Sequence, residues 1–286
     1  MRPEIAANLR RTPRSEHKSP CDGARSMAVT RIPERPRSMS YTLHRGDALT
    51  VLKALPDECI DAVITDPPYN SGGRTSSERT SRTARAKYTS GDAAHDLANF
   101  PGENRDQRSY RSWLTELLTE AYRAATEHSV AMVFTDWRQE PTTSDALQMA
   151  GWTWTGTIPW IKPASRPRKG GFKQSSEFIL WGVKGTLNKD RDLYLPGHFI
   201  ASQPRKGRVH ITQKPVEVMQ QLVRICPEGG TVLDPFTGSG STGVAALRER
   251  RNFVGVELSP HYADVADGRL RRELTQDDFV LAGPEA

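Results

Sequence analysis

The run GGTVLDPFTGSGSTGVAAL, residues 229–247, constrains the fold more than any other part of this chain. A short apolar strand leads into a glycine-rich turn, and a helix follows the turn. The spacing Gly238-x-Gly240-x-x-Gly243 fits the fingerprint of a nucleotide-type cofactor site, and Glu257 ends the next predicted strand. Such glycines let a cofactor lie against the backbone, while the acid binds ribose hydroxyls. The order of these parts predicts an open α/β sheet with a cofactor at its edge.

Predicted strands alternate with predicted helices from residue 41 to residue 274. The apolar patterns place strands at 41–44, 60–65, 129–135, 152–162, 177–183, 231–233 and 253–257. They place helices at 47–55, 110–127, 142–150, 216–225, 242–250 and 261–274. In the strand that includes them, Trp152, Trp154 and Trp160 are expected on one side. The alternation argues for a parallel, doubly wound α/β sheet.

The length of 286 residues is enough for one large α/β domain or two small ones. No apolar stretch approaches the length of a membrane span, and no hydrophobic signal segment is visible, so we expect no membrane partner. The three cysteines, Cys21, Cys59 and Cys226, are scattered and form no C-x-x-C pair. We therefore expect no disulfide framework, no metal site and a reducing, cytoplasmic location.

Two segments have the composition of disorder or mobility. Residues 1–38 are rich in Arg, Pro and Ser with little apolar periodicity, and we expect a disordered basic tail that the domain at 39–286 does not need. Residues 70–108 contain few apolar residues and many Gly, Ser, Thr and Arg, which predicts a long mobile loop. Residues 184–213 are polar and are expected to be irregular.

The net charge of +6 is not evenly distributed. Residues 1–40 carry most of the excess, and the basic residues of the remaining chain gather in three polar segments. The candidate DNA-phosphate contacts are Arg74, Arg79, Arg82, Arg85 and Lys87; Lys162, Arg166, Arg168 and Lys169; and Arg205, Lys206 and Arg208. Any one cluster also fits a solvated loop, but three together favour nucleic acid as a partner.

A second motif, ITDPPYNSGG at residues 64–73, follows directly on an apolar strand. Pro67 and Pro68 fix φ and remove two backbone donors, so the peptide after Asp66 is extended and keeps its carbonyl groups free. A carboxylate, rigid carbonyls and the Tyr69 ring indicate a pocket for a flat ligand that donates hydrogen bonds. Asp66 by itself would also suit a turn.

Asp234 distinguishes between the two cofactor classes that share the glycine-rich turn. A carboxylate here would repel the pyrophosphate of a dinucleotide but attract the cationic amino and sulfonium groups of S-adenosylmethionine. Both Asp66 and Asp234 end predicted strands, and ligands of open α/β sheets sit beyond such ends. If the two strands are neighbours, cofactor and target lie side by side.

The motifs TDPPYN and LDPFTGSGSTG resemble the two signature motifs of DNA amino-methyltransferases. TQKP at 212–215 and WIKP at 160–163 also resemble elements of that family. The catalytic motif precedes the cofactor motif, an order similar to the β group, and DPPY is more similar to adenine-N6 than to cytosine-N4 enzymes. The resemblance covers residues 41–274. It implies the class I S-adenosylmethionine-dependent methyltransferase fold, a mixed, mostly parallel, doubly wound seven-stranded sheet with helices on both faces.

On this resemblance, Asp66, Pro67, Pro68 and Tyr69 form the catalytic motif. Adenine N6 is a poor nucleophile because its lone pair is delocalised into the ring. Asp66 and the Pro67 carbonyl would each accept one N6–H bond and direct the lone pair at the methyl group. Tyr69 would stack on the base, which has to leave the duplex to be reached.

The cofactor side of the site would consist of Asp47, Thr212, Lys214, Asp234, Pro235, Phe236, Gly238, Gly240 and Glu257. Several of these have a structural alternative. Asp47 is equally suited to cap the helix that follows it, and Glu257 to precede a helix start. Lys214 also fits a solvated lysine at a helix start, and Phe236 a core aromatic. We expect Trp160 in the core rather than stacked on a base.

The resemblance implies duplex DNA as a partner, with residues 184–211 as a short target-recognition insertion and 70–108 as a basic lid. A second copy of the chain and a separately encoded restriction nuclease are further candidate partners. The expected location is the cytoplasm, at the nucleoid, in a bacterial or phage-like setting. The sequence does not reveal the target site. Three other functions stay open: cytosine-N4 methylation, an NAD-dependent oxidoreductase and a non-catalytic DNA-binding module.

Overall fold

The computed structural model describes residues 39–69, 105–165, 167–203 and 213–282, with side chains to residue 275. All of these belong to one compact unit. The predicted tail and most of the predicted lid lie outside the described residues. So do 204–211, the end of the proposed target-recognition insertion.

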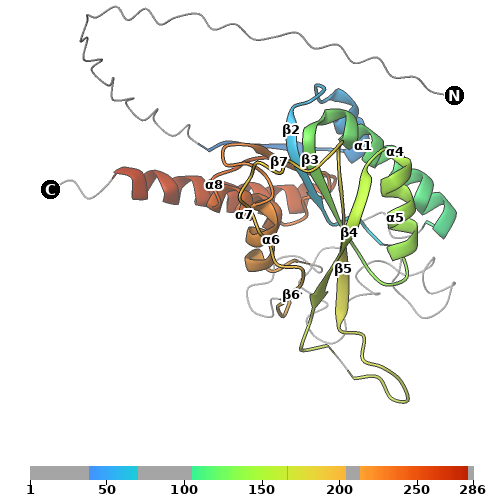
Figure 1. Ribbon diagram of the computed structural model, residues 1–286. Helices are drawn as coiled ribbons and strands as arrows, with labels where there is room; N and C mark the ends of the chain where they lie inside the picture. The colour runs from blue at the N-terminus through green and yellow to red at the C-terminus, as the bar shows by residue number, and fades with distance from the viewer. Residues whose placement is uncertain (1–38, 70–104, 166, 204–212, 283–286) are drawn as a thin grey trace, which may run out of the picture. The chain divides into compact units, whose positions relative to one another are not determined.

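The described residues build a single mixed sheet (Figure 1). Its strands lie in the order β1-β8-β7-β2-β3-β5-β4-β6. Their bounds are β1 (Tyr41–Arg45), β2 (Ile60–Thr65), β3 (Ala125–Thr135), β4 (Thr153–Ile161), β5 (Ser176–Val183), β6 (Phe199–Ile200), β7 (Thr231–Asp234) and β8 (Asn252–Glu257). Strand β5 runs antiparallel to β3 and β4, and all other neighbours are parallel. The predicted mixed, mostly parallel sheet is confirmed.

Helices cover both faces of the sheet, which confirms the doubly wound arrangement (Figure 1). One face packs against α1 (Ala48–Ala54), α4 (Gln107–Ala124) and α5 (Glu140–Met149). The other packs against α6 (Val216–Val223), α7 (Ser241–Arg248) and α8 (Pro260–Ala282). The central strands therefore bury apolar side chains on both sides, as expected for the near-continuous apolar run of β2.

Several boundaries differ from the sequence prediction. Helix α4 begins earlier than predicted because the Asp106 carboxylate accepts the backbone N–H of Arg108 and of Ser109, which caps the helix inside the predicted loop. It passes directly into β3 at Ala125, so this strand is longer than predicted. The sheet gains an eighth strand, the two-residue β6, in a segment expected to be irregular.

The prediction that the three tryptophans share one side of this strand is wrong. Trp152, just before β4, is buried on the face covered by α4 and α5, Trp160 is buried on the opposite face, and Trp154 is 41% exposed. The pairing of β4 with β5 shifts register between Trp154 and Gly156, and this irregularity breaks the two-residue alternation of side chains.

The carboxyl ends of most strands lie along one edge of the sheet, the edge that crosses the strand ends. Parallel β2, β3, β7 and β8 present their carboxyl ends there, and β4 joins them because it is antiparallel to β5. The antiparallel β5 instead begins at this edge, where Glu177 pairs with Trp160. The edge lies at the β6 end of Figure 1, and the β4–β5 connection projects from it.

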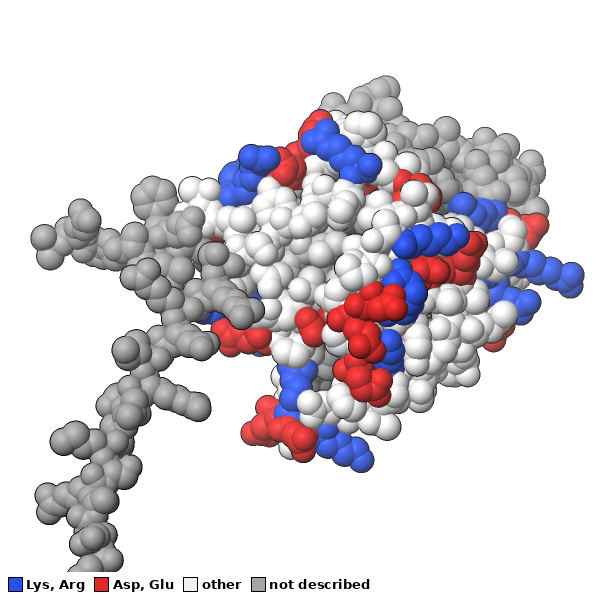
Figure 2. Space-filling model, turned by 90° about the horizontal axis from the view of Figure 1, so that it is seen from above, with Lys and Arg blue, Asp and Glu red and all other residues white. Residues whose placement is uncertain are grey.

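The opposite end of the molecule carries charges of both signs. Figure 2 views the molecule from above Figure 1, and on this face Lys and Arg side chains stand among Asp and Glu side chains. Among the residues that the structure describes, no helix combines the length and apolar character needed to cross a membrane.

Candidate active site

A cavity of about 540 Å³ lies at the edge where the strands end. Its lining includes most of the residues predicted for the site, from both sequence motifs. They are Asp47, Asp66, Pro67, Pro68, Tyr69, Lys162, Lys214, Asp234, Pro235, Phe236, Gly238 and Glu257. A cavity of this size and mixed lining is typical of small-molecule sites. The structure therefore brings the two motifs to one cavity.

The other predicted site residues are not part of this lining. Arg168 and Lys169 are exposed on the β4–β5 connection. Gly240 is a neighbour of the lining but not a member. Outside the described residues are Thr212, Arg74, Arg79, Arg82, Arg85, Lys87, Arg166, Arg205, Lys206 and Arg208.

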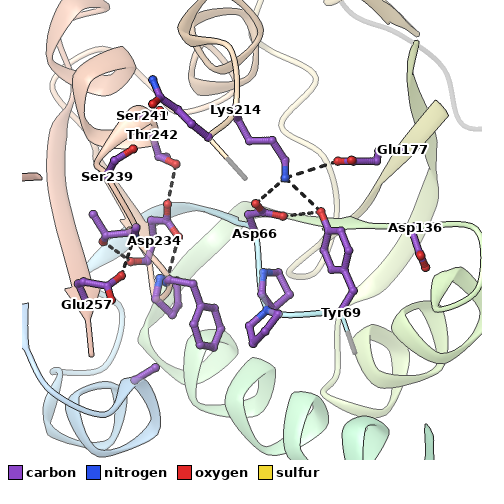
Figure 3. A pocket seen from close by; sticks show the side chains of 18 of the residues that line it. Asp66, Tyr69, Asp136, Glu177, Lys214, Asp234, Ser239, Ser241, Thr242 and Glu257 are labelled. Atoms are coloured by element: carbon purple, nitrogen blue, oxygen red, sulfur yellow. Dashed lines mark hydrogen bonds and ion pairs between the residues drawn. The ribbon is translucent and has the colours of Figure 1, made fainter. Parts of the chain in front are cut away.

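The two motifs meet because β2 and β7 are paired strands, with Val63 opposite Leu233. At the end of this pair, the Thr65 hydroxyl donates to Asp234 at 2.9 Å. Asp66 is the next residue after Thr65, so the two carboxylates lie beside one another (Figure 3). The expectation that the two strands are neighbours is confirmed.

Asp234 is almost fully buried and is held by three donors. Its Oδ1 accepts from the Thr65 hydroxyl and from the backbone N–H of Phe236, at 2.9 and 3.1 Å, and its Oδ2 from the Thr242 hydroxyl at 2.6 Å. Burial raises the pKa of Asp234 to about 6, against the pull of these donors. The carboxylate thus fixes the start of the glycine-rich turn as well as giving the cavity a negative charge.

Glu257 binds the same turn from the neighbouring strand β8. Its Oε2 accepts from the backbone N–H of Gly238 at 2.8 Å, and its Oε1 from that of Ser259 at 2.7 Å. The residue therefore supports the turn and also precedes the start of α8, the alternative weighed from sequence. Burial raises the pKa of Glu257.

Gly240 has a packing reason to be glycine. Its φ is +83°, and a Cβ there would lie 3.2 Å from the Cβ of Ala266 on α8. The residue lets the turn approach α8 closely, and the cofactor contact expected of it stays a prediction.

The helix-cap alternative for Asp47 is present in the structure. Its carboxylate accepts from the backbone N–H of Thr50 at 2.9 Å, so it caps α1 while lining the cavity. Phe236 also lines the cavity and packs on Trp113, with ring centroids 5.5 Å apart. Trp160 is fully buried, and its indole N–H donates to the Ala201 carbonyl, which confirms its expected place in the core.

Both carboxylate oxygens of Asp66 are bound by side chains of this chain (Figure 3). The Tyr69 hydroxyl donates to Oδ1, and the Lys214 ammonium lies 2.5 Å from Oδ2. Lys214 is 5% exposed, so the alternative of a solvated lysine is wrong. It directly precedes Pro215, the residue before α6, and it reaches the catalytic motif rather than open solvent.

Glu177 is a site residue that sequence reasoning missed. Its Oε1 lies 2.5 Å from the Lys162 ammonium and its Oε2 3.5 Å from the Lys214 ammonium. With Asp66 these form a line of alternating charges. The only available signal was an acid at the start of a predicted strand. Strand direction decides where that start lies, and the sequence did not show that β5 is antiparallel.

In this row of alternating charges, each charged group stabilises the ionised form of its neighbour. Burial raises the pKa of Asp66, and the Lys214 ammonium opposes that effect. Burial lowers the pKa of Lys214, but Asp66 and Glu177 raise it further, so the net direction is upward. Burial also raises the pKa of Tyr69 well above 10. Lys214 is therefore a cation and Tyr69 a hydroxyl donor at neutral pH.

The DNA methylase family model (N6_N4_Mtase) matches residues 60–267, which is most of the chain. The chain belongs to the DNA methylase family. Membership confirms the resemblance to the DNA amino-methyltransferases, and S-adenosylmethionine as their cofactor. It leaves adenine N6 and cytosine N4 as the two acceptors, and it removes the NAD-dependent alternative.

The similarity to individual relatives extends over most of both chains. M.Cfr9I, a Type II methyltransferase of Citrobacter freundii, is 28% identical over 274 residues, which cover 82% of this chain and 89% of that protein. The crystal structure of the M1.HpyAVI–SAM complex matches with a TM-score of 0.57 at 24% identity, covering 80% of this chain and 98% of that one. The cytosine-N4-specific PvuII DNA methyltransferase matches with a TM-score of 0.61 at 17% identity, covering 84% and 91%. Both structures confirm the fold.

The residues of the cavity suit S-adenosylmethionine. The carboxylates of Asp234 and Glu257 offer negative charge to a sulfonium and an amino group, and acceptors to ribose hydroxyls. Phe236 and Leu258 offer apolar contact to a purine. Gly238, at φ +54°, keeps the turn free of a side chain at the cavity wall.

Proposed function

We propose that this DNA methylase transfers a methyl group from S-adenosylmethionine to N6 of adenine in duplex DNA. The observation that carries the proposal is the pairing of β2 with β7, which sets Asp66 beside Asp234 on one cavity. A target site and a cofactor site that share a wall allow direct transfer between them. Adenine is preferred to cytosine because the catalytic motif begins with Asp in DPPY.

The catalytic motif acts on the amino group of the base. The Asp66 carboxylate and the Pro67 carbonyl accept the two N–H bonds, which turns the lone pair out of conjugation with the ring. Tyr69 stacks on the flipped base, a role compatible with its place beside Asp66. When bound, S-adenosylmethionine supplies an electrophilic methyl group. Asp66 then holds the proton that the methylated amine releases.

The cofactor residues act by position and charge. Asp234 and Glu257 present two carboxylates next to the glycine-rich turn that both of them bind. Asp47 contributes a third carboxylate at the rim without giving up its helix cap. These groups are fixed by hydrogen bonds to the fold, so little reorganisation accompanies binding.

Duplex DNA would approach the edge where the cavity opens. Arg168 and Lys169 on the β4–β5 connection are exposed there, and residues 184–211 and the lid at 70–108 are proposed to contribute target recognition and backbone contacts. A homodimer and a separately encoded nuclease are compatible partners for such an enzyme. A cytoplasmic, nucleoid-associated location goes with duplex DNA as substrate.

Incubation of the purified protein with labelled S-adenosylmethionine and unmethylated duplex DNA tests the proposal. After digestion to nucleosides, we expect the label in N6-methyladenosine of the deoxy series. Label in N4-methylcytosine would instead assign the same site to cytosine. Absence of labelled DNA would contradict methyl transfer altogether and favour a non-catalytic DNA-binding role.

A further inference from the structure

The geometry around Asp66 raises a question about substrate entry. The proposed role of Asp66 needs room at one carboxylate oxygen for the amino group of the base. In the structure Tyr69 donates to Oδ1 and Lys214 to Oδ2, so an amino group that approaches either oxygen competes with the donor already there. Tyr69 leaves Oδ1 if it turns to stack on the base. An amino group that approaches Oδ2 competes with the Lys214 ammonium, a buried charge that needs another partner when it is displaced.

Glu177 offers that partner. Its Oε2 is buried, lies 3.5 Å from the Lys214 ammonium and, within the described part of the chain, accepts no hydrogen bond. Lys162 holds the other oxygen, Oε1, at 2.5 Å. The Glu177 carboxylate points toward Lys214 (Figure 3). The second position for the ammonium is thus already built and close to the first.

We propose that Glu177 is a positioning residue that receives the Lys214 ammonium from Asp66 when the amino group of the target base enters. This inference rests on the proposed methyl transfer to an exocyclic amine and holds for adenine or cytosine. It makes Asp66 available without leaving a lysine charge unpaired in the site.

Among the described residues, the carboxylates paired with the Lys214 ammonium are those of Asp66 and Glu177, and the Tyr69 hydroxyl lies 3.3 Å from it. The ammonium lies 5.1 Å from the ring centroid of Phe134, 5.5 Å from that of Tyr69 and 5.9 Å from that of Trp160. These rings keep bulk water away, and they stabilise a cation wherever it sits between the two carboxylates. Glu177 is ionised and can therefore pair with the displaced Lys214 ammonium. Burial raises the pKa of Glu177, but Lys214 and Lys162 lower it by more, so it lies below the usual value.

The first test uses the protein alone, without DNA or cofactor. A crystal structure of Asp66→Ala removes the first position and leaves Glu177 intact. We expect the Lys214 ammonium within hydrogen-bonding distance of Glu177 Oε2, a shift of about 1 Å from the distance at which it now lies. An ammonium that keeps its place, or turns to solvent, overturns the proposal whether or not the protein methylates DNA.

The second test measures methyl incorporation into DNA in a single turnover with both substrates saturating. Glu177→Gln keeps the shape of the side chain but cannot stabilise the displaced ammonium, so we expect the rate to fall about 10- to 100-fold. S-adenosylmethionine affinity should change little, and the assays are run well below the Tm of each variant, because removing one charge of a buried pair lowers stability. The matched control is Glu273→Gln, since Glu273 is an equally shielded glutamate paired with Arg248 at 2.7 Å, away from the cavity. Equal rates for Glu177→Gln and the control contradict the proposal.

A double-mutant cycle separates this role from a general structural one. If Glu177 acts through Lys214, adding Glu177→Gln to Lys214→Met should change the rate less than about twofold. A full additional loss means that Glu177 acts independently. If Lys214→Met leaves no measurable rate, the Asp66→Ala structure decides. A wild-type protein that transfers no methyl group contradicts the proposed function, whereas that structure still reports on the ammonium.

Discussion

At the scale of residues, the two aspartates of the site do different work although they are adjacent. Asp234 is held by three neutral donors and keeps the glycine-rich turn in place. Asp66 is held by a hydroxyl and an ammonium, partners that can be exchanged for those of a substrate. Replacing each in turn should therefore separate catalysis from cofactor binding.

Asp66→Asn should reduce methyl transfer by at least about 100-fold, because the amide cannot offer a charged acceptor to the amino group of the base. S-adenosylmethionine binding should stay nearly unchanged, since Asp234 keeps its own donors. Single-turnover assays and calorimetric titration of the cofactor measure the two effects. Asp145→Asn, at an exposed residue paired with Arg111, serves as the control. A parallel loss of cofactor affinity in Asp66→Asn would count against the assigned role.

Cofactor affinity should depend on pH through Asp234. Its pKa of about 6 means that the carboxylate binds a proton below that pH, and a neutral acid no longer attracts a cationic ligand. Affinity should therefore weaken as pH falls through about 6, by at most tenfold per pH unit. Calorimetric titration of S-adenosylmethionine from about pH 5 to about pH 8, a range that includes this pKa, measures the change in affinity. Asp234→Asn should remove most of the pH dependence, and Glu257→Gln measures the share that the second raised carboxyl contributes.

The raised pKa of Asp234 also makes the free energy of unfolding depend on pH. The native protein binds the Asp234 proton more tightly than the unfolded chain, whose aspartates titrate near 3.9. The contribution of this group to the free energy of unfolding is therefore greatest below about pH 4 and falls as pH rises to about 6. The change is on the order of 3 kcal/mol and levels off above that pH. Comparing the urea stability of wild type and Asp234→Asn across this range isolates the contribution; identical pH profiles would show that Asp234 does not titrate there.

At the scale of elements, packing of α7 against β8 and α8 fixes the cofactor turn. A Cβ on Gly243 would lie 2.6 Å from Leu270 and 2.7 Å from Phe253, so Gly243→Ala should force the helices apart. We expect a loss of about 1–3 kcal/mol in stability and weaker S-adenosylmethionine binding. Thermal unfolding and calorimetry measure both.

Gly268 on α8 provides the matched control for that change. A Cβ there meets nothing within 4 Å, so Gly268→Ala should stabilise the helix by about 0.5–1 kcal/mol and leave binding unchanged. If both alanines behaved alike, close packing around Gly243 could not be what fixes the turn.

Elements were predictable from sequence where local patterns decide them. The apolar run of β2 and the glycine-rich turn after β7 appear where predicted, because burial and turn chemistry act on neighbouring residues. Glu177 and the partner of Lys214 were not predictable, since they depend on strand direction and on pairing across the sheet. Trp154 was misplaced because a register shift is a property of two strands together.

At the scale of the whole molecule, the distribution of charge distinguishes the two ends of the sheet. The end shown in Figure 2 mixes acidic and basic side chains. Away from the cavity end, Arg250, which precedes β8, pairs with Glu228, which precedes β7, and Arg224, at the end of α6, pairs with Glu249. The cavity end carries the β4–β5 connection with exposed Arg168 and Lys169. A polyanion gains more from exposed cations of this kind than from cations that are already paired with carboxylates.

The approach of DNA to the cavity end can be tested by its salt dependence. The base of the β4–β5 connection is closed by two hydrogen bonds of 2.6 Å. The Lys162 N–H donates to the Ser175 carbonyl, and the Lys173 ammonium donates to the Pro163 carbonyl. Removing one cation that neutralises a DNA phosphate lowers the slope of log affinity against log salt by about 0.9.

Arg168→Ser with Lys169→Ser should therefore weaken duplex binding and lower that slope by nearly 2, while S-adenosylmethionine binding stays unchanged. Arg224→Ser with Arg250→Ser removes the same charge from the opposite end and should leave the slope as it is. Fluorescence anisotropy with one labelled duplex over a series of salt concentrations measures all three proteins. Equal slopes for the two double variants would mean that net charge alone matters, and that DNA does not bind preferentially where the cavity opens.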